Sequence, residues 1–181
     1  MDDELLDLVN KDDAVIGTIN RTEYERLVSE KLGYLRSCQF FQLNSDGKVF
    51  VPIRTAHKTI APNGFDYTAG GHVGAGDNYM QAMIREAKEE LNLDLDSTEL
   101  ELIAKVVEED IRYINCIYLL RKDEAPELNS EDFVSGEWMT PDELITQIEA
   151  GHPAKKSLRH AALLLHEYLR KLQSSDRPVL A

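Results

Sequence analysis

The chain has 181 residues, of which 43% are hydrophobic, and it carries a formal net charge of −13. A chain of this length buries roughly 70% of its unfolded surface, so it can build a core without disulfide or metal staples. The negative charge argues against nucleic acid and anionic membranes as partners, because both are bound largely through Lys and Arg. The two cysteines form neither a disulfide framework nor a CxxC metal motif.

The first half of the chain predicts strands, one helix and a glycine-rich stretch. The expected strands cover residues 13–19, 35–43 and 48–54. A helix is expected over residues 21–31, with Thr22 as a cap. Asn44-Ser45-Asp46-Gly47 has the composition of a hairpin turn. Residues 58–64 contain Pro, Asn and Gly and are expected to form a loop.

The second half predicts a long helix over residues 77–91, followed by strands and two further helices. The expected strands cover residues 100–107, 113–120 and 133–139. Thr140, Pro141 and Glu143 form the start signal of a helix, with Thr140 as N-cap and Glu143 completing a capping box. A last helix is expected over about residues 154–172. This order predicts one α/β (α+β) domain over residues 1–181, with a mixed sheet flanked by helices.

The helix over residues 77–91 carries an unusual group of acids. Its apolar positions share one face, namely Met80, Met83, Ile84, Ala87 and Leu91. Glu86, Glu89 and Glu90 are predicted on the other side, and Asp77 is expected to cap the helix. A solvated helix face is the commonest fate of such acids. However, like charges one turn apart cost roughly 0.2–0.5 kcal/mol per pair, and clustered carboxylates suit Mg²⁺ or Mn²⁺.

The spacing around these acids resembles the Nudix box. Gly71, five residues, Asp77, seven residues and then Arg85-Glu86-Ala87-Lys88-Glu89-Glu90-Leu91-Asn92-Leu93 match seven of the nine positions that the box specifies. Asp77 replaces a Glu and Asn92 replaces a Gly. Asn is common at a left-handed helix end, so Asn92 can still close the helix. The resemblance implies a Nudix-like fold with the box at residues 71–93.

The resemblance also implies roles for residues of the box. Glu86 and Glu90 are the expected principal ligands of Mg²⁺ or Mn²⁺, with Glu89 as a further ligand or as the residue that orients or deprotonates the attacking water. The Gly71 carbonyl is expected near the metal. Arg85 is expected to pair with a carboxylate and fix the helix. The implied reaction is hydrolysis of a phosphoanhydride in a nucleoside diphosphate derivative or a similar small molecule.

Further segments resemble the branch of Nudix proteins related to isopentenyl-diphosphate isomerase, over roughly residues 5–150. They are Asp12 to Thr18, Arg21, Asn44 to Gly47, Arg54 to Lys58 and Gly71 to Val73. The isomerases use a cysteine before the Gly-His pair and a glutamate on a later strand. This chain has Gly70 at the first position and no acid among residues 112–115, so the isomerase remains an alternative without its acid and base.

Other residues allow more than one role. Arg54 and Lys58 are placed near the diphosphate by the resemblance, although exposed solubilising cations would look the same. His72 fits a metal ligand or, more often, a structural hydrogen-bonding residue. Residues 108–110 are either a polar turn or the source of an extra acid. A non-catalytic domain that senses a nucleotide is the alternative from another class, and the intact acids argue against it.

The chain start is acidic and lacks the basic residues of a signal peptide, and no apolar run is long enough to span a bilayer. We therefore expect a cytoplasmic protein whose partner is a small-molecule diphosphate, without nucleic acid or membrane. The sequence does not indicate the oligomeric state, and a homodimer is left open.

Overall fold

A computed structural model describes residues 4–175. Its main sheet has six strands in the order β6-β7-β3-β4-β8, with β5 paired to β3 outside this path. The strands are β3 (Leu35–Leu43), β4 (Val49–Arg54), β5 (Ala69–His72), β6 (Leu100–Glu108), β7 (Tyr113–Arg121) and β8 (Phe133–Met139). β3 and β7 run parallel, and the other pairs are antiparallel. The expected mixed sheet is confirmed.

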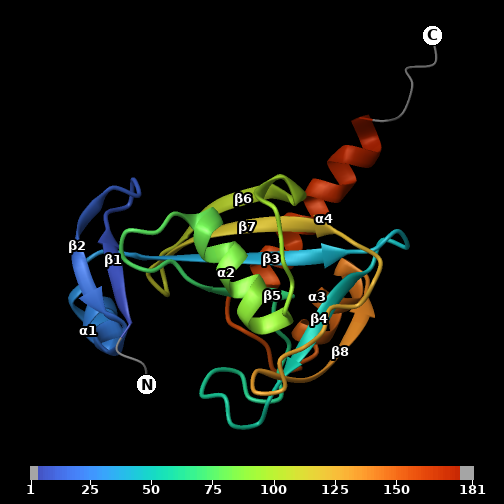
Figure 1. Ribbon diagram of the computed structural model, residues 1–181, viewed down its shortest axis with the longest axis horizontal. Coiled ribbons are helices and arrows are strands. Elements are labelled where there is room, and N and C mark those ends of the chain that lie inside the picture. Colours follow the sequence, from blue (N-terminus) through green and yellow to red (C-terminus); the bar gives the residue numbers. More distant parts are fainter. Residues whose placement is uncertain (1–3, 176–181) are drawn as a thin grey trace.

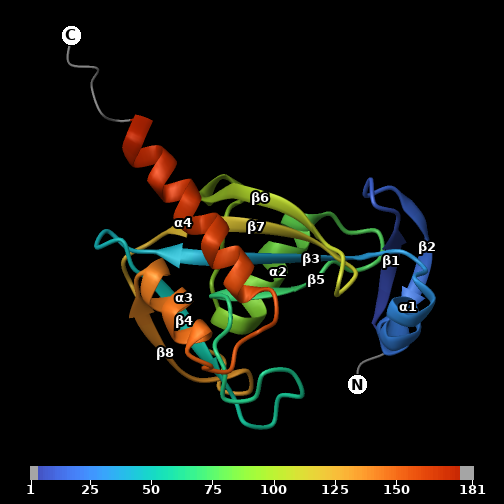
Figure 2. The ribbon, with the colours of Figure 1, turned by 180° about the vertical axis from the view of Figure 1, so that it is seen from behind.

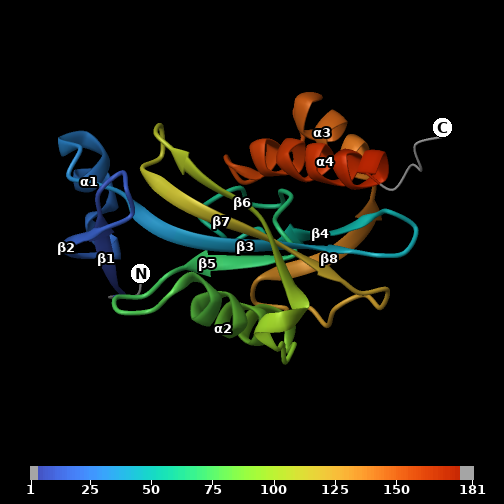
Figure 3. The same ribbon diagram turned by 90° about the horizontal axis from the view of Figure 1, so that it is seen from above.

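Helices cover both faces of this sheet (Figure 3). α2 (Tyr79–Leu91) lies on one face, and α3 (Pro141–Glu149) and α4 (Leu158–Ser175) lie on the other. Side chains alternate across a strand, and β3 shows this directly. Cys38 and Phe40 belong to the core under α2, whereas Phe41 and Leu43 belong to the core under α3 and α4. The sheet thus separates two apolar cores.

A smaller unit precedes the main sheet at one of its ends (Figures 1 and 2). β1 (Leu5–Val9) and β2 (Val15–Asn20) form a two-stranded antiparallel sheet, followed by the short α1 (Tyr24–Glu30). Arg36 ties this unit to β3, because its Nε donates to Asp13 Oδ1 at 2.6 Å. β1 was not predicted from the sequence.

Several predicted boundaries were wrong by a few residues. Asn20 caps the turn before α1, rather than Thr22, because its side chain accepts from the Thr22 amide. Asn78, rather than Asp77, caps α2 in a reciprocal box with Gln81. α4 begins at Leu158 instead of residue 154, since residues 153–155 hydrogen-bond to Phe65 as extended backbone.

Other expectations are confirmed. Gly47 has φ +75°, as the hairpin turn between β3 and β4 requires. Asn92 ends α2 in the left-handed conformation, with φ 49°. Thr140 caps α3 with the expected box to Glu143. In the described part of the chain, no helix has the length and apolar character needed to cross a membrane, and Cys38 and Cys116 are both free and buried. Asp2 and Asp3 of the acidic chain start lie outside the described residues.

Candidate active site

The acids of α2 do not share one environment. The Glu89 side chain is 58% exposed, whereas the Glu86 side chain is only 12% exposed. Glu86 and Glu90 are one turn apart and turn toward β5, while Glu89 faces solvent. The interpretation as a solvated helix face therefore holds for Glu89 and is wrong for Glu86 and Glu90.

Gly71 makes the space that Glu86 occupies. A Cβ built on Gly71 would lie 2.2 Å from the Glu86 carboxyl carbon, closer than any real contact. The residue opposite Gly71 on β3 is Cys38, so the carboxylate lies directly against the strand backbone. Burial raises the pKa of Glu86, and the neighbouring guanidinium of Arg85 opposes that rise. The position of Glu86 therefore depends on the absence of a side chain at Gly71.

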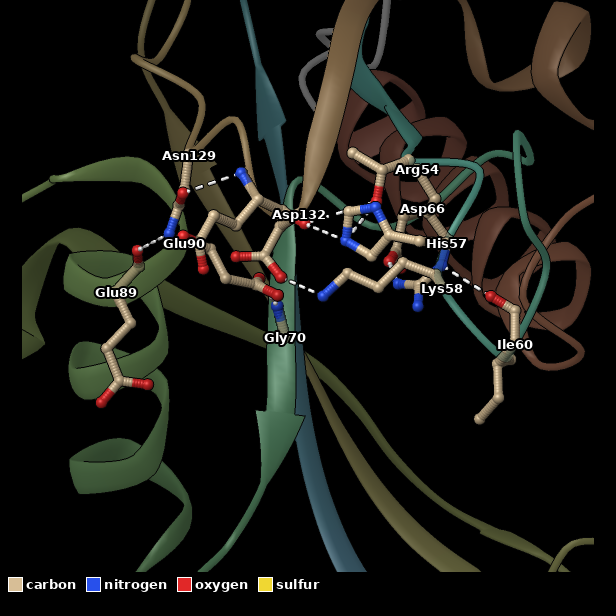
Figure 4. Close-up of polar contacts among 12 residues, drawn as sticks. Arg54, His57, Lys58, Ile60, Asp66, Gly70, Glu89, Glu90, Asn129 and Asp132 are labelled. Atoms are coloured by element: carbon tan, nitrogen blue, oxygen red, sulfur yellow. Dashed lines mark hydrogen bonds and ion pairs between the residues drawn. The ribbon is translucent and has the colours of Figure 1, made fainter. Parts of the chain in front are cut away.

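Glu90 reaches the free edge of the same strand. Its Oε2 accepts a hydrogen bond of 2.9 Å from the Gly70 backbone amide, as Figure 4 shows. Burial, opposed by the charge of Lys155, raises the pKa of Glu90 to about 8. Asp66 and Glu86 add to the rise through their negative charges. A carboxylate in this position lacks sufficient positive charge around it.

Arg85 holds one side of this arrangement. One guanidinium nitrogen donates to Glu86 at 2.8 Å and to Glu89 at 3.3 Å. The other donates to the His72 backbone carbonyl at 3.1 Å. Arg85 therefore links α2 to β5 and pairs with Glu86. An exposed ion pair contributes only about 0–1 kcal/mol to stability. The more important effect of Arg85 is therefore that it orients the Glu86 carboxylate.

The carboxyl-terminal end of α2 is closed by the loop before β8. The backbone amide of Asn129 donates to the Glu90 carbonyl at 2.8 Å, and its side-chain amide donates to the Glu89 carbonyl at 3.2 Å (Figure 4). These bonds satisfy backbone oxygens that the helix leaves unpaired. They also fix the backbone of the two residues that carry the acids.

Arg54 and Lys58 have internal partners. Arg54 is 8% exposed, its guanidinium pairs with Asp66, and its Nε donates to the Ile60 carbonyl at 2.8 Å. Lys58 has a half-buried side chain that pairs with Asp132. In the view of Figure 4, Lys58 extends from the loop after β4 into the region between Glu90 and the Arg54–Asp66 pair. Lys58 can therefore reach a ligand more readily than Arg54.

Two residues of this region were missed in the sequence. Asp66 is 2% exposed and lies between β4 and β5. Lys155 precedes α4, and its Nζ lies 3.0 Å from Asp66 Oδ1. The Lys155 backbone amide donates to the Phe65 carbonyl at 3.1 Å, which fixes the loop. Neither residue belongs to a motif or a periodic pattern, so only the fold brings them to the site.

The other predicted candidates lie at the margin of the site. His72 is neutral, because burial lowers its pKa to about 3, and its Nε2 lies 2.9 Å from the Tyr113 hydroxyl. This position fits the hydrogen-bonding role. Glu108 Oε1 lies 2.7 Å from His160 Nδ1 of α4. Glu109 pairs with Lys11 at 2.5 Å, away from α2.

The donor set fits a hard divalent cation. Carboxylates and a backbone carbonyl are the oxygens that Mg²⁺ and Mn²⁺ prefer, and Glu86 and Glu90 are acids whose pKa is raised by burial. Within residues 4–175, however, no three His, Cys, Asp or Glu side chains are already gathered around one point. A bound ion would require a rotation of Glu89, or a ligand from the backbone, to complete its shell.

The raised pKa of Glu90 predicts how the free energy of unfolding of the metal-free protein depends on pH. Its folded-state pKa of about 8 lies above the unfolded value, 4.5. As pH rises between these values, the unfolded chain loses its proton first, so the free energy of unfolding falls, by about 5 kcal/mol in total. Urea unfolding from pH 5 to 9 with a chelator should show this fall, and Mg²⁺ or Mn²⁺ should reverse it most strongly near pH 8. A flat profile would contradict the burial of this carboxylate.

Comparisons with known proteins identify the family of the chain. The model of the NUDIX domain matches residues 35–161. A Nudix hydrolase of Deinococcus radiodurans is 38% identical over 162 residues, which are 86% of this chain and 90% of the relative. An uncharacterized Nudix hydrolase of Nostoc sp. strain PCC 7120 is 38% identical over 157 residues, covering 86% and 91% of the two chains.

Solved structures extend the likeness to three dimensions. The crystal structure of DR0079 from Deinococcus radiodurans has a TM-score of 0.77 and 36% identity, and covers 88% of this chain and 97% of that one. The MutT protein of Methanosarcina mazei Go1 shares the fold alone, with a TM-score of 0.58 and 14% identity over 77% and 96% of the chains. The chain belongs to the NUDIX family and is a Nudix hydrolase.

Proposed function

We propose that this hydrolase cleaves a phosphoanhydride bond in a diphosphate-containing small molecule with the help of Mg²⁺ or Mn²⁺. The observation that carries the proposal is the pair Glu86 and Glu90, turned inward against Gly71 and Gly70. Burying two acids beside each other costs stability unless a cation joins them. A divalent ion at this point is the simplest reason for the arrangement.

Each residue of the site has its own proposed role. Glu86, Glu90 and the Gly71 carbonyl would hold the ion, and Glu89 would complete the set. A bound divalent cation neutralises a diphosphate and makes its phosphorus easier to attack. Glu89, which is exposed, would also orient or deprotonate a water. Arg85 keeps Glu86 in position through the 2.8 Å bond between them.

Cations on the other side of Gly70 would receive the phosphates. Lys58 can exchange Asp132 for a phosphate oxygen, because its side chain is partly exposed. Arg54 is enclosed by Asp66 and the Ile60 carbonyl. We therefore propose direct substrate contact for Lys58 and a supporting position for Arg54. Both proposals keep the predicted location near the diphosphate.

The kinship with the isomerase branch is part of the proposal, but isomerase chemistry is disfavoured. At Gly70 there is no thiol. The nearest cysteine along β3, Cys38, lies on the α2 face, and burial raises its pKa to about 12. A thiol of that pKa does not exchange protons readily near neutral pH. Asn115 occupies the strand where the isomerases carry an acid.

The proposal is tested with a substrate panel. The panel contains nucleoside di- and triphosphates, dinucleoside polyphosphates, ADP-ribose and isopentenyl diphosphate, each with Mg²⁺ or Mn²⁺. We expect metal-dependent phosphate release from at least one compound and none in chelator. Tight binding of one compound without turnover would instead favour a sensing domain. Conversion of isopentenyl to dimethylallyl diphosphate would establish the isomerase.

We further propose that residues 1–181 act as one Nudix-like unit in the cytoplasm, with the small-molecule diphosphate as the partner. Size-exclusion chromatography with light scattering of the full chain would show whether it is a monomer or a homodimer.

A further inference from the structure

The sheet face under α4 changes from apolar to polar along β3 and β7. Phe41, Leu43, Ile117 and Leu119 pack into the core on this face. Because side chains alternate across a strand, Ser37, Gln39 and Asn115 point to the same face. All three are buried, with exposures of 7%, 7% and 2%. We call these three residues the polar row.

The polar row is linked internally but leaves one acceptor without a partner. Gln39 Nε2 donates to Ser37 Oγ at 3.0 Å, and Ser37 in turn donates to Asn115 Oδ1. Gln39 Oε1 is buried and has no hydrogen-bond partner in the described chain. A buried acceptor without a partner lowers the stability of the fold. A Leu or Met at this position would continue the apolar face at lower cost.

A second buried glutamine on β3 provides a comparison. Gln42 Oε1 also lacks a partner in the described chain, and by strand alternation this residue shares the opposite face with Phe40. The Gln42 amide nitrogen, however, donates to the carbonyls of Lys122 and Glu124 and anchors the chain after β7. Gln42 therefore has a structural purpose. Gln39 donates only to Ser37, so its presence needs another explanation.

The polar row lies on the α4 face of β3 and β7, and β3 pairs directly with β5, whose backbone the carboxylates of α2 approach from the other face. Gln39 pairs with Gly70 in the sheet register, and a Cβ on Gly70 would lie 2.8 Å from Gln39 Cγ. The same Gly70 donates its amide to Glu90. An organic group attached to a diphosphate bound at Glu90 would therefore lie about one strand away from the polar row. Lys155 precedes α4, and its Nζ lies 3.0 Å from Asp66 Oδ1.

We propose that the polar row is a specificity determinant that recognises the organic group of the substrate, with Gln39 Oε1 accepting a hydrogen bond from an O–H or N–H of that group. The inference rests on the proposed function. A site built to pair polar groups discriminates strongly against a ligand that lacks them, because its own groups then stay unpaired. A diphosphate bearing a hydroxylated or amine-bearing group therefore binds better than one bearing a hydrocarbon.

Side-chain amide resonances test the inference without turnover. Protein labelled with ¹⁵N, in Mg²⁺, is titrated with the α,β-methylene analogues of ADP, GDP, CDP and UDP, and separately with methylenediphosphonate. We expect at least one nucleoside analogue to shift the Gln39 amide signals while Gln42 stays unmoved. Methylenediphosphonate should shift Gly70 and Gly71 but not Gln39. Shifts at Gly70 and Gly71 with every analogue, without any at Gln39, would overturn the role of the polar row and leave the hydrolase proposal intact. No shift at Gly70, Gly71 or Gln39 with any compound would contradict both the role of the polar row and the proposed function.

Kinetics of matched variants provide the second test. Gln39→Met should lower kcat/KM for the preferred nucleoside substrate by roughly 10- to 100-fold. It should lower kcat/KM for isopentenyl diphosphate much less, because the hydrocarbon of that compound offers Gln39 no hydrogen-bond donor. The control Gln42→Met removes the other buried amide and should preserve the ratio between the two substrates. Equal losses on both substrates in Gln39→Met, or the same change of ratio in Gln42→Met, would contradict the inference.

Discussion

Replacing Glu90 with Gln is expected to lower kcat/KM for a diphosphate substrate by about 100-fold or more, while raising the stability of the metal-free protein at pH 8. The two effects have one cause. The Glu90 carboxylate is desolvated, so its charge is costly without a cation and useful with one. Glutamine has the same shape, and its side-chain oxygen can still accept from the Gly70 amide. The variant should therefore fold with the same contacts and lose only the charge.

Three measurements separate this expectation from a general loss of structure. Urea unfolding in chelator at pH 8 should give a higher midpoint for Glu90→Gln than for the wild type. Calorimetric titration should show weaker Mn²⁺ binding, and the rate of phosphate release should fall. Glu99→Gln is a suitable control, since this exposed acid lies in the turn before β6, away from the site. Wild-type turnover by Glu90→Gln would remove this residue from the proposed metal ligands.

The exposure of the acids shows what sequence reasoning could and could not predict. The helix, its apolar face and its end at Asn92 follow from local patterns, and the structure confirms them. The pattern placed all three acids opposite the apolar face, which is correct only for Glu89. Glu86 and Glu90 are largely shielded from solvent because β5 carries glycines where they approach. A helical wheel contains no information about the neighbouring strand.

β5 itself shows a second limit. Its sequence, Ala69-Gly70-Gly71-His72, has neither the alternation nor the β-branched residues by which strands are predicted. The pairing with β3 creates the strand, and that pairing is long-range. The Asp66–Lys155 contact joins residues almost ninety positions apart along the chain and has no local signal either. Motif spacing located the chemistry, while tertiary packing decided which residues surround it.

Replacing Gly71 with Ala is expected to reduce kcat/KM by about 100-fold, the cost of displacing a reacting group by about 1 Å. The added methyl group would lie 2.2 Å from the Glu86 carboxyl carbon and 2.3 Å from its Oε1. The backbone of Gly71 is held to β3 by pairing with Cys38, so the carboxylate must move rather than the strand. Its displacement also breaks the 2.8 Å bond through which Arg85 orients Glu86.

The matched control for this variant is Gly17→Ala, at a glycine with nothing within 4 Å of the added Cβ. It should retain wild-type activity and Mn²⁺ affinity. Gly71→Ala should keep a native near-ultraviolet circular dichroism spectrum but bind Mn²⁺ more weakly, because the moved Glu86 no longer shares an ion with Glu90. Full activity and unchanged Mn²⁺ affinity in Gly71→Ala would show that the position of Glu86 against this strand is not required. Since the same substitution leaves every charge of the site in place, a loss of binding can be attributed to geometry alone.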